Sequence, residues 1–157
     1  MNRFTTAYVL AGADRPEVAV LGALVTIVVR AEETGGVIGA VDYRMPPHYV
    51  GPPAHIHPDF DEIFLMREGS LTFRVGDERR VAAPGDTAVV PGNVPHTFAN
   101  QAAEPARVTI LVMPGGFESY FEELPPLIVD GKPNLEAIGK LSESYGVTTV
   151  GPPLSQT

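Results

Sequence analysis

Short runs of apolar residues, separated by turn residues, fill the first 113 positions of the chain. In one of these runs Leu71, Phe73 and Val75 alternate with polar residues, which is the period of a half-buried strand. Runs of this length, with turn signals between them and no helical periodicity, predict an all-β sandwich or barrel. The predicted strands cover residues 4–10, 24–31, 37–43, 54–57, 62–67, 71–75, 78–82, 87–90, 94–100 and 106–113.

The most apolar run, residues 18–29, is too short to span a bilayer, which needs about 20 residues. It is rich in Val, Ile and Thr and contains Gly22, so we interpret it as a buried strand. The N-terminus shows no basic segment followed by an apolar one, as a signal peptide would. We therefore expect a cytoplasmic protein.

The pattern becomes helical after residue 113. Apolar side chains at Phe117, Tyr120, Phe121 and Leu124 have the spacing of an amphipathic helix, which Pro125 and Pro126 would end. Such a short helix needs a partner surface, either on the barrel or on a second subunit.

A second helix is predicted from an N-cap at Asn134 to Tyr145, with Gly146 ending it. Leu135, Ile138 and Leu141 would share one face with Tyr145. Since no linker or long repeat divides the chain, we expect one domain over residues 1–157. It would comprise a barrel at about 20–113 and a helical extension at about 115–157.

Composition narrows the possible chemistry. The chain has no Cys and four His, so disulfides, thiolate nucleophiles and iron–sulfur clusters are excluded, and a metal would need His and carboxylate ligands. The net charge of −8 is a poor match to nucleic acid or to an anionic membrane.

Three of the four histidines stand in a pattern with one glutamate. His55 and His57 are two positions apart, so on a strand both would project from one face, and Glu62 and His96 follow on later strands. Such an N/O donor set suits one divalent transition metal: Fe, Mn, Ni, Co, Cu or Zn. Four protein ligands would leave one or two positions for water, substrate or dioxygen. The alternative for an isolated His-x-His pair is two surface histidines, and His48 is interpreted as a loop residue.

The order His55-x-His57-x4-Glu62-x6-Gly69, then Gly85-x5-Pro91-x4-His96-x3-Asn100, resembles both signature motifs of the cupin superfamily. The resemblance implies an all-β jelly-roll barrel (a double-stranded β-helix) with C-terminal helices. It also implies a metal held by His55, His57, Glu62 and His96, turns at Gly69 and Gly85, and a structural role for Asn100. Two positions depart from the motifs, because Tyr49 and Asn93 replace glycines. Asn tolerates the left-handed conformation, so the second turn can persist.

Alternation predicts that apolar side chains of the barrel surround the metal, and we expect the C-terminal segment to cover the mouth. Such a pocket suits a flat aromatic or polyketide-like molecule. The predicted pocket residues are Tyr49, Phe64, Met66, Phe73, Phe98, Phe117 and Phe121. The alternative for these aromatic side chains is core packing.

The runs PPAHIHPDFDEIFLMREGSLTFRV and PGNVPHTFAN are similar to quercetinase-like cupins, which cleave a flavonol with dioxygen. This resemblance implies a metal-dependent dioxygenase in which Glu62 is both ligand and catalytic base. The alternatives are a non-redox isomerase or cyclase acting on an aromatic or polyketide intermediate, and a non-catalytic ligand-binding protein. Resemblance to small cupins also implies a homodimer.

Overall fold

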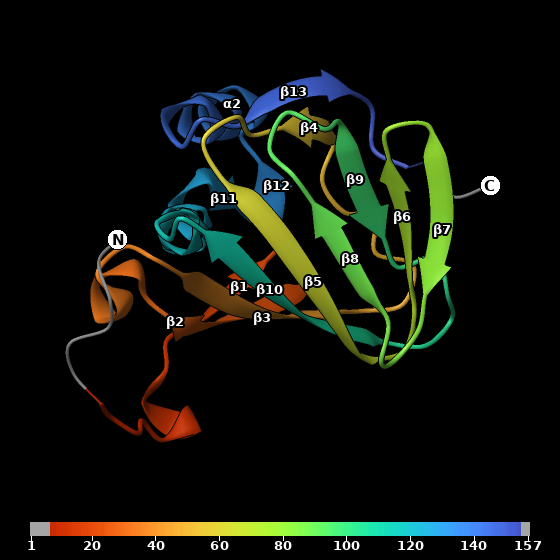
Figure 1. Ribbon diagram of the computed structural model, residues 1–157. Helices are drawn as coiled ribbons and strands as arrows, with labels where there is room; N and C mark the ends of the chain where they lie inside the picture. Colours follow the sequence, from red (N-terminus) through yellow and green to blue (C-terminus); the bar gives the residue numbers. More distant parts are fainter. Residues whose placement is uncertain (1–6, 155–157) are drawn as a thin grey trace.

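Two antiparallel sheets pack face to face in the computed structural model, which describes residues 7–154 (Figure 1). The first sheet has the order β1-β2-β3-β10-β5-β8, and the second has the order β13-β4-β9-β6-β7. This is the predicted jelly-roll architecture. The strands of the first sheet are β1 (Glu17–Val20), β2 (Ala23–Val29), β3 (Gly39–Met45), β10 (Ala106–Met113), β5 (Asp61–Glu68) and β8 (Thr87–Val90). Those of the second are β13 (Thr148–Gly151), β4 (Ala54–Ile56), β9 (His96–Ala99), β6 (Leu71–Val75) and β7 (Glu78–Ala82).

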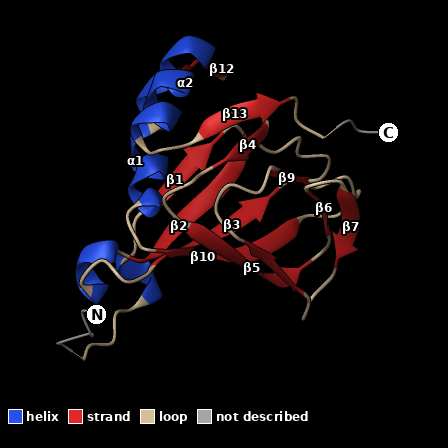
Figure 2. Ribbon diagram, turned by 45° about the horizontal axis from the view of Figure 1, so that its top comes forward, coloured by secondary structure: helices blue, strands red, loops and turns tan. Residues whose placement is uncertain are grey.

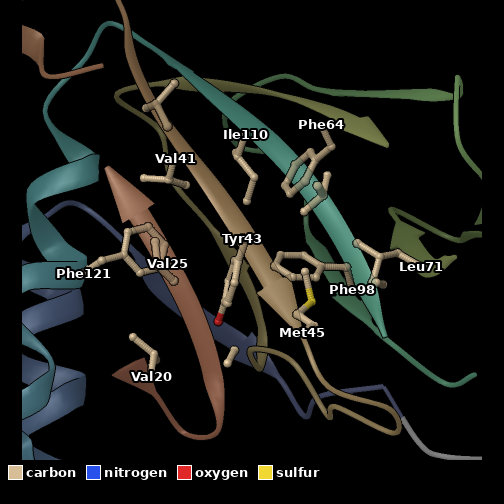
Figure 3. Packing of buried hydrophobic residues seen from close by; sticks show 14 of the residues in the cluster. Val20, Val25, Val41, Tyr43, Met45, Phe64, Leu71, Phe98, Ile110 and Phe121 are labelled. Atoms are coloured by element: carbon tan, nitrogen blue, oxygen red, sulfur yellow. The ribbon is translucent and has the colours of Figure 1, made fainter. Parts of the chain in front are cut away.

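The core lies between the sheets because alternate side chains of each strand point inward. Along β5, Glu62, Phe64 and Met66 are buried while their neighbours are more exposed. Phe64 contacts Phe73 and Phe98 of the opposite sheet edge-on, at ring-centroid distances of 5.2 and 5.4 Å. Figure 3 shows Phe64 and Phe98 among the apolar side chains of this interior.

The apolar run at 18–29 forms two strands, and the prediction of one strand is wrong. Leu21 and Gly22 both have positive φ, 49° and 91°, a combination that turns the chain into the β1–β2 hairpin. The predicted strand at 4–10 is not formed in residues 7–10, the part of it that the structure describes. Residues 4–6 lie outside the described part, and residues 7–10 are irregular, with the Val9 side chain 98% exposed.

The first predicted helix is shorter than its apolar pattern. A 3-10 turn, η3 (Phe117–Ser119), leads into α1 (Tyr120–Glu123), and the prolines begin a further turn, η4 (Pro125–Leu127). Only these turns fit in the segment, because it begins after Gly116, whose φ of 139° is not helical, and the two prolines interrupt the helix that follows. Phe121 and Leu124 are nevertheless buried, as the pattern indicated.

The second predicted helix is confirmed as α2 (Leu135–Ser144). The side chain of Asn134 accepts a hydrogen bond from the Ala137 amide at 3.1 Å, and Gly146 follows with φ 74°. Ile138 and Leu141 pack on the core, but Leu135 is 75% exposed, so its predicted place on that face is wrong. Leu135 directly follows the N-cap, at the start of the helix.

The helices lie together on one side of the barrel (Figure 2), where α1 contacts β1 and α2 contacts β13. None of the helices in residues 7–154 has the length and apolar character needed to cross a membrane. The remaining elements are η1 (Gly12–Asp14), η2 (Ala31–Thr34), β11 (Ile128–Val129) and β12 (Lys132–Pro133).

Candidate metal centre

The four residues of the sequence pattern come together at one end of the barrel. Their donor atoms all lie within 4.8 Å of one another. His55 in β4 is the register partner of His96 in β9, whereas Glu62 belongs to β5 of the other sheet, so the cluster joins the two sheets. His57, Glu62 and His96 are at most 5% exposed, and His55 is half-buried.

Backbone carbonyls hold one nitrogen of each imidazole. Nδ1 of His55 lies 2.8 Å from the carbonyl oxygen of Pro53, Nδ1 of His57 lies 2.7 Å from that of Phe60, and Nδ1 of His96 lies 2.9 Å from that of Val94. A carbonyl can only accept, so Nδ1 carries the proton and donates it. In each neutral ring Nε2 is therefore the atom with the free lone pair, which is the tautomer that a metal ligand needs.

Lone pairs converge inside the cluster. The Nε2 atoms of His57 and His96 are 3.2 Å apart, and both lie close to Oε2 of Glu62, at 3.1 and 3.2 Å. Three buried acceptors in contact repel one another unless a proton or a metal cation lies between them. Imidazole nitrogen and carboxylate oxygen together suit a divalent transition metal, so the donor set fits such an ion.

The surroundings set the protonation states of the cluster. Burial raises the pKa of the Glu62 carboxyl, but hydrogen bonds and positive charge from His57 and His96 outweigh it and lower that pKa to about 2. Burial lowers the pKa of His57, but the hydrogen bond and charge of Glu62 raise it above the usual value. Burial, assisted by His96, lowers the pKa of His55 to about 4. An ionised Glu62 and a neutral His55 are the forms in which these side chains bind metals.

The loop that carries His57 rests on a glycine of the second motif. The Gly92 amide donates a 2.7 Å hydrogen bond to Oδ1 of Asp61. A Cβ at Gly92 would lie 2.9 Å from the carbonyl oxygen of His57 and 3.0 Å from that of Phe60, so only glycine fits. Asn93 follows with φ 66°, the left-handed conformation that the sequence predicted for it.

The remaining motif residues have structural contacts. The Asn100 amide group donates to the carbonyls of Pro46 and Glu104, at 2.9 and 2.8 Å, which agrees with the role expected for it. The carbonyl oxygen of Tyr49 accepts a hydrogen bond from the backbone amide of Asn100. The Tyr49 hydroxyl lies 2.8 Å from the hydroxyl of Tyr43. His48 is exposed on the loop and lies outside the cluster.

The predicted pocket residues occupy different places. Phe64, Phe73 and Phe98 form the interior layer next to the ligands, since Phe64 follows Glu62 by two residues on β5 and Phe98 follows His96 by two on β9. Met66 and Phe121 are buried in the same core, with Tyr49 packed against it. Phe117 stacks on Phe60, a ring that the sequence reasoning did not identify. The signal that could have identified Phe60 was its position among the four residues between the ligands His57 and Glu62.

Two hollows lie on the described part of the protein, and none of the four cluster residues is in their walls. A cleft of about 430 Å³ runs between the edge strands β7 and β8, with Phe73, Val75 and Ala88 in its wall. Val75 is the register partner of His96, so the cleft reaches within one strand of a ligand. A groove of about 360 Å³ lies on the helical side, lined in part by Phe60, Phe117 and Tyr145.

Comparison with known proteins agrees with this fold. The family model described as "Cupin domain" matches residues 41–113. Quercetin 2,3-dioxygenase from Aspergillus japonicus is 40% identical over 72 residues, which cover 43% of this chain but only 20% of that protein.

Among solved structures, KdgF from Halomonas sp. superposes with a TM-score of 0.63 and 22% identity, covering 71% of this chain and 96% of KdgF. The polyketide cyclase RemF from Streptomyces resistomycificus gives a TM-score of 0.60 and 15% identity, covering 69% of this chain and 80% of RemF. At these identities the two structures show a shared fold. Residues 41–113 therefore carry a cupin domain, and the fold around them is one that solved cupin structures share.

Proposed function

We propose that His55, His57, Glu62 and His96 bind one divalent transition metal, from the set Fe, Mn, Ni, Co, Cu and Zn. The observation that carries this proposal is the 3.2 Å approach of two imidazole Nε2 atoms beside the Glu62 carboxylate. Each imidazole already gives its proton to a backbone carbonyl, so a cation is the simplest way to satisfy the lone pairs.

The function that this centre supports best is a dioxygenase acting on a flavonol-like or other aromatic molecule. The support is the 40% identity to a quercetin 2,3-dioxygenase over 72 residues, together with the aromatic layer beside the cluster. The aligned part is a fifth of that relative, so the activity comes to this chain as a proposal.

A bound metal would supply Lewis acidity, which makes a phenolic hydroxyl easier to deprotonate. Glu62 is ionised and would accept that proton at its carboxylate, a contribution of about 10²–10⁴ in rate for a well-placed base. Its register partners Val90 and Val112 are 0% and 1% exposed and keep water from the carboxylate. The three imidazoles, anchored through Nδ1, hold the directions of their Nε2 atoms.

We assign the approach of the substrate to the cleft between β7 and β8. Its volume of about 430 Å³ suits a small aromatic molecule, and Phe73 in its wall belongs to the aromatic layer. Contact of the substrate with Phe64, Phe98 and Met66 would require those packed side chains to move. Contact with Tyr49, Phe117 and Phe121 stays a prediction from the sequence.

The experiment measures oxygen uptake and carbon monoxide release when metal-loaded protein meets quercetin, with metal-free protein as the control. We expect metal-dependent consumption of both reactants. Turnover of an aromatic or polyketide substrate under strict anaerobiosis would instead establish the non-redox alternative, an isomerase or cyclase, and the polyketide cyclase RemF shares this fold. Ligand binding without turnover would establish the non-catalytic alternative.

We also propose that the protein is a homodimer. The support is the resemblance to small cupins, together with the edge position of β1 in the first sheet, where a second copy could pair. Sedimentation at micromolar concentration tests this, and a monomer there would contradict it. The cytoplasmic location stays a prediction from the sequence.

A further inference from the structure

Phe60 contacts the ligand His57 in two ways. Its backbone carbonyl accepts the Nδ1 proton of His57 at 2.7 Å. Its ring stacks on the imidazole with centroids 4.0 Å apart and an interplanar angle of 9°. The hydrogen bond fixes the tautomer of the imidazole, and the parallel ring fixes the plane in which Nε2 can point.

The Phe60 ring is itself held on its other side. Phe117 stacks on it at 4.9 Å and 25°, and Tyr120 stacks on Phe117 at 5.0 Å and 14°. Tyr145 meets Phe117 edge-on at 6.1 Å. Phe60 is only 7% exposed, so its ring has little space in which to turn. A stack of three rings, Phe60, Phe117 and Tyr120, therefore connects His57 with the C-terminal helical segment.

The Phe60 carbonyl is held as well. Gly92 lies so close that a Cβ there would be 3.0 Å from this oxygen and 2.9 Å from the oxygen of His57. The loop from His57 to Asp61 thus lies between the Gly92 backbone and the aromatic stack. The Gly92 backbone and the aromatic stack thus both contact Phe60, which is not itself one of the four proposed metal ligands.

We propose that Phe60, supported by Phe117, is a positioning residue of the metal centre that fixes the tautomer and the ring plane of His57. This inference rests on the proposed metal site and deepens it. It also assigns a part in the centre to η3 and α1, which follow the segment that matches the cupin family model.

The first test is titration of the metal-free protein with Co²⁺, followed by calorimetry and by the visible absorption of the bound ion. We expect Phe60→Leu to weaken binding about tenfold and to change the Co²⁺ spectrum, because loss of an outer support typically costs 10- to 100-fold in affinity. Phe117→Leu should have a smaller effect in the same direction. Phe60→Tyr, which keeps the aromatic ring, should retain the Co²⁺ affinity and spectrum of the wild type.

The matched control is Leu71→Ala, which removes a fully buried side chain from the end of β6 remote from His96. It should lower the thermal unfolding midpoint while leaving the Co²⁺ affinity and spectrum unchanged. If Phe60→Leu is folded and binds Co²⁺ with wild-type affinity and spectrum, the inference is wrong. Phe117→Leu and Phe60→Tyr supply the same comparison should Phe60→Leu not fold.

The second test needs no metal. Long-range ¹H–¹⁵N spectra of the metal-free protein, at alkaline pH where imidazoles are neutral, report which nitrogen of His57 is protonated. We expect the Nδ1–H form in the wild type. In Phe60→Leu the carbonyl is retained, but without the stacked ring the imidazole plane can turn away from it, so we expect a weaker hydrogen bond and a mixture of tautomers. A wild-type protein that shows this tautomer but binds no Co²⁺ would contradict the proposed metal site and leave the positioning role supported. An unchanged tautomer together with an unchanged Co²⁺ spectrum in Phe60→Leu would overturn the positioning role alone.

Discussion

His57 and His96 bring their Nε2 atoms to 3.2 Å from each other, and neither nitrogen carries a proton in the neutral ring. His57 comes from the loop after β4 and His96 from β9, 39 residues further along the chain. Glu62 Oε2, from the opposite sheet, lies 3.1 Å from one and 3.2 Å from the other. The fold therefore concentrates electron pairs at a buried point, and the consequences of this arrangement can be measured.

Metal binding is expected to stabilise the protein. An ion that binds the folded chain at 100 times its Kd adds about 2.7 kcal/mol, because it binds the native state and not the unfolded one. For a chain of this length that corresponds to about 5 to 10 °C in Tm. Thermal unfolding with and without Co²⁺ or Zn²⁺ measures it, and His96→Ala should abolish the shift. An equal shift in wild type and variant would mean that the ion binds elsewhere.

Glu62→Gln is expected to reduce oxygen consumption with a flavonol by about 10²–10⁴, because the amide cannot accept the hydroxyl proton. Glu68→Gln, at the other end of β5 and on the surface, is the matched control and should retain wild-type activity. Initial rates should be compared at equal metal occupancy. Undiminished turnover in Glu62→Gln would assign the base to another group.

The sequence was sufficient to predict the cluster because its information is local and periodic. His55 and His57 share a strand face, and Glu62 and His96 follow at fixed spacings that the cupin motifs identify. Strand boundaries were predicted well where alternation is regular, as for 71–75, and where turn residues flank the strand, as for 78–82 and 87–90. Asn93 was also predicted, because few residues other than glycine tolerate a positive φ.

Other features depend on tertiary contacts that no local pattern encodes. Residues 18–29 are apolar apart from Gly22 and Thr26 and show no alternation, so the backbone angles at Leu21 and Gly22 are what separate two strands from one. The apolar positions from Phe117 to Leu124 have helical spacing in a segment too short for a full helix. Phe60 contacts His57 through its carbonyl and through a stack completed by Phe117, 57 residues later. The aromatic residues predicted as one pocket likewise divide between the core, a cleft and a groove.

Gly92→Ala is expected to destabilise the protein by about 1–3 kcal/mol, the usual cost of forcing atoms into a packed site. Its Cβ would lie 2.9 to 3.2 Å from the carbonyl oxygens of His57, Phe60 and Pro58, so the loop must shift and metal affinity should fall with it. Gly139→Ala is the control, since nothing lies within 4 Å of its Cβ position in α2. That change should stabilise by about 0.5–1 kcal/mol. Urea unfolding and Co²⁺ titration of both variants measure these effects.

Acid is expected to weaken the attachment of α1 to the barrel. The hydrogen bond from Arg30 lowers the pKa of the Glu122 carboxyl, so the pair stabilises the fold fully above the ordinary carboxyl pKa. That contribution is lost as the pH falls through the lowered pKa, where Glu122 takes up a proton. Both side chains are partly solvated, so the effect should be about 0.5 kcal/mol. Urea unfolding at neutral and acid pH should show a smaller pH dependence in Glu122→Gln, and an identical dependence would contradict the assignment.

Narrowing the cleft between β7 and β8 is expected to impair substrate binding without affecting the metal. Ala88 lies in its wall and pairs with Phe64 on β5, so Ala88→Phe would fill the space in front of the aromatic layer. KM for a flavonol should rise at least about tenfold, which corresponds to about 1.4 kcal/mol of lost binding, while Co²⁺ affinity stays unchanged. Val129→Phe, on the exposed β11, is the control and should leave KM unaltered. If Ala88→Phe keeps the wild-type KM, the substrate must enter elsewhere, and the groove lined by Phe60, Phe117 and Tyr145 would be the next site to block.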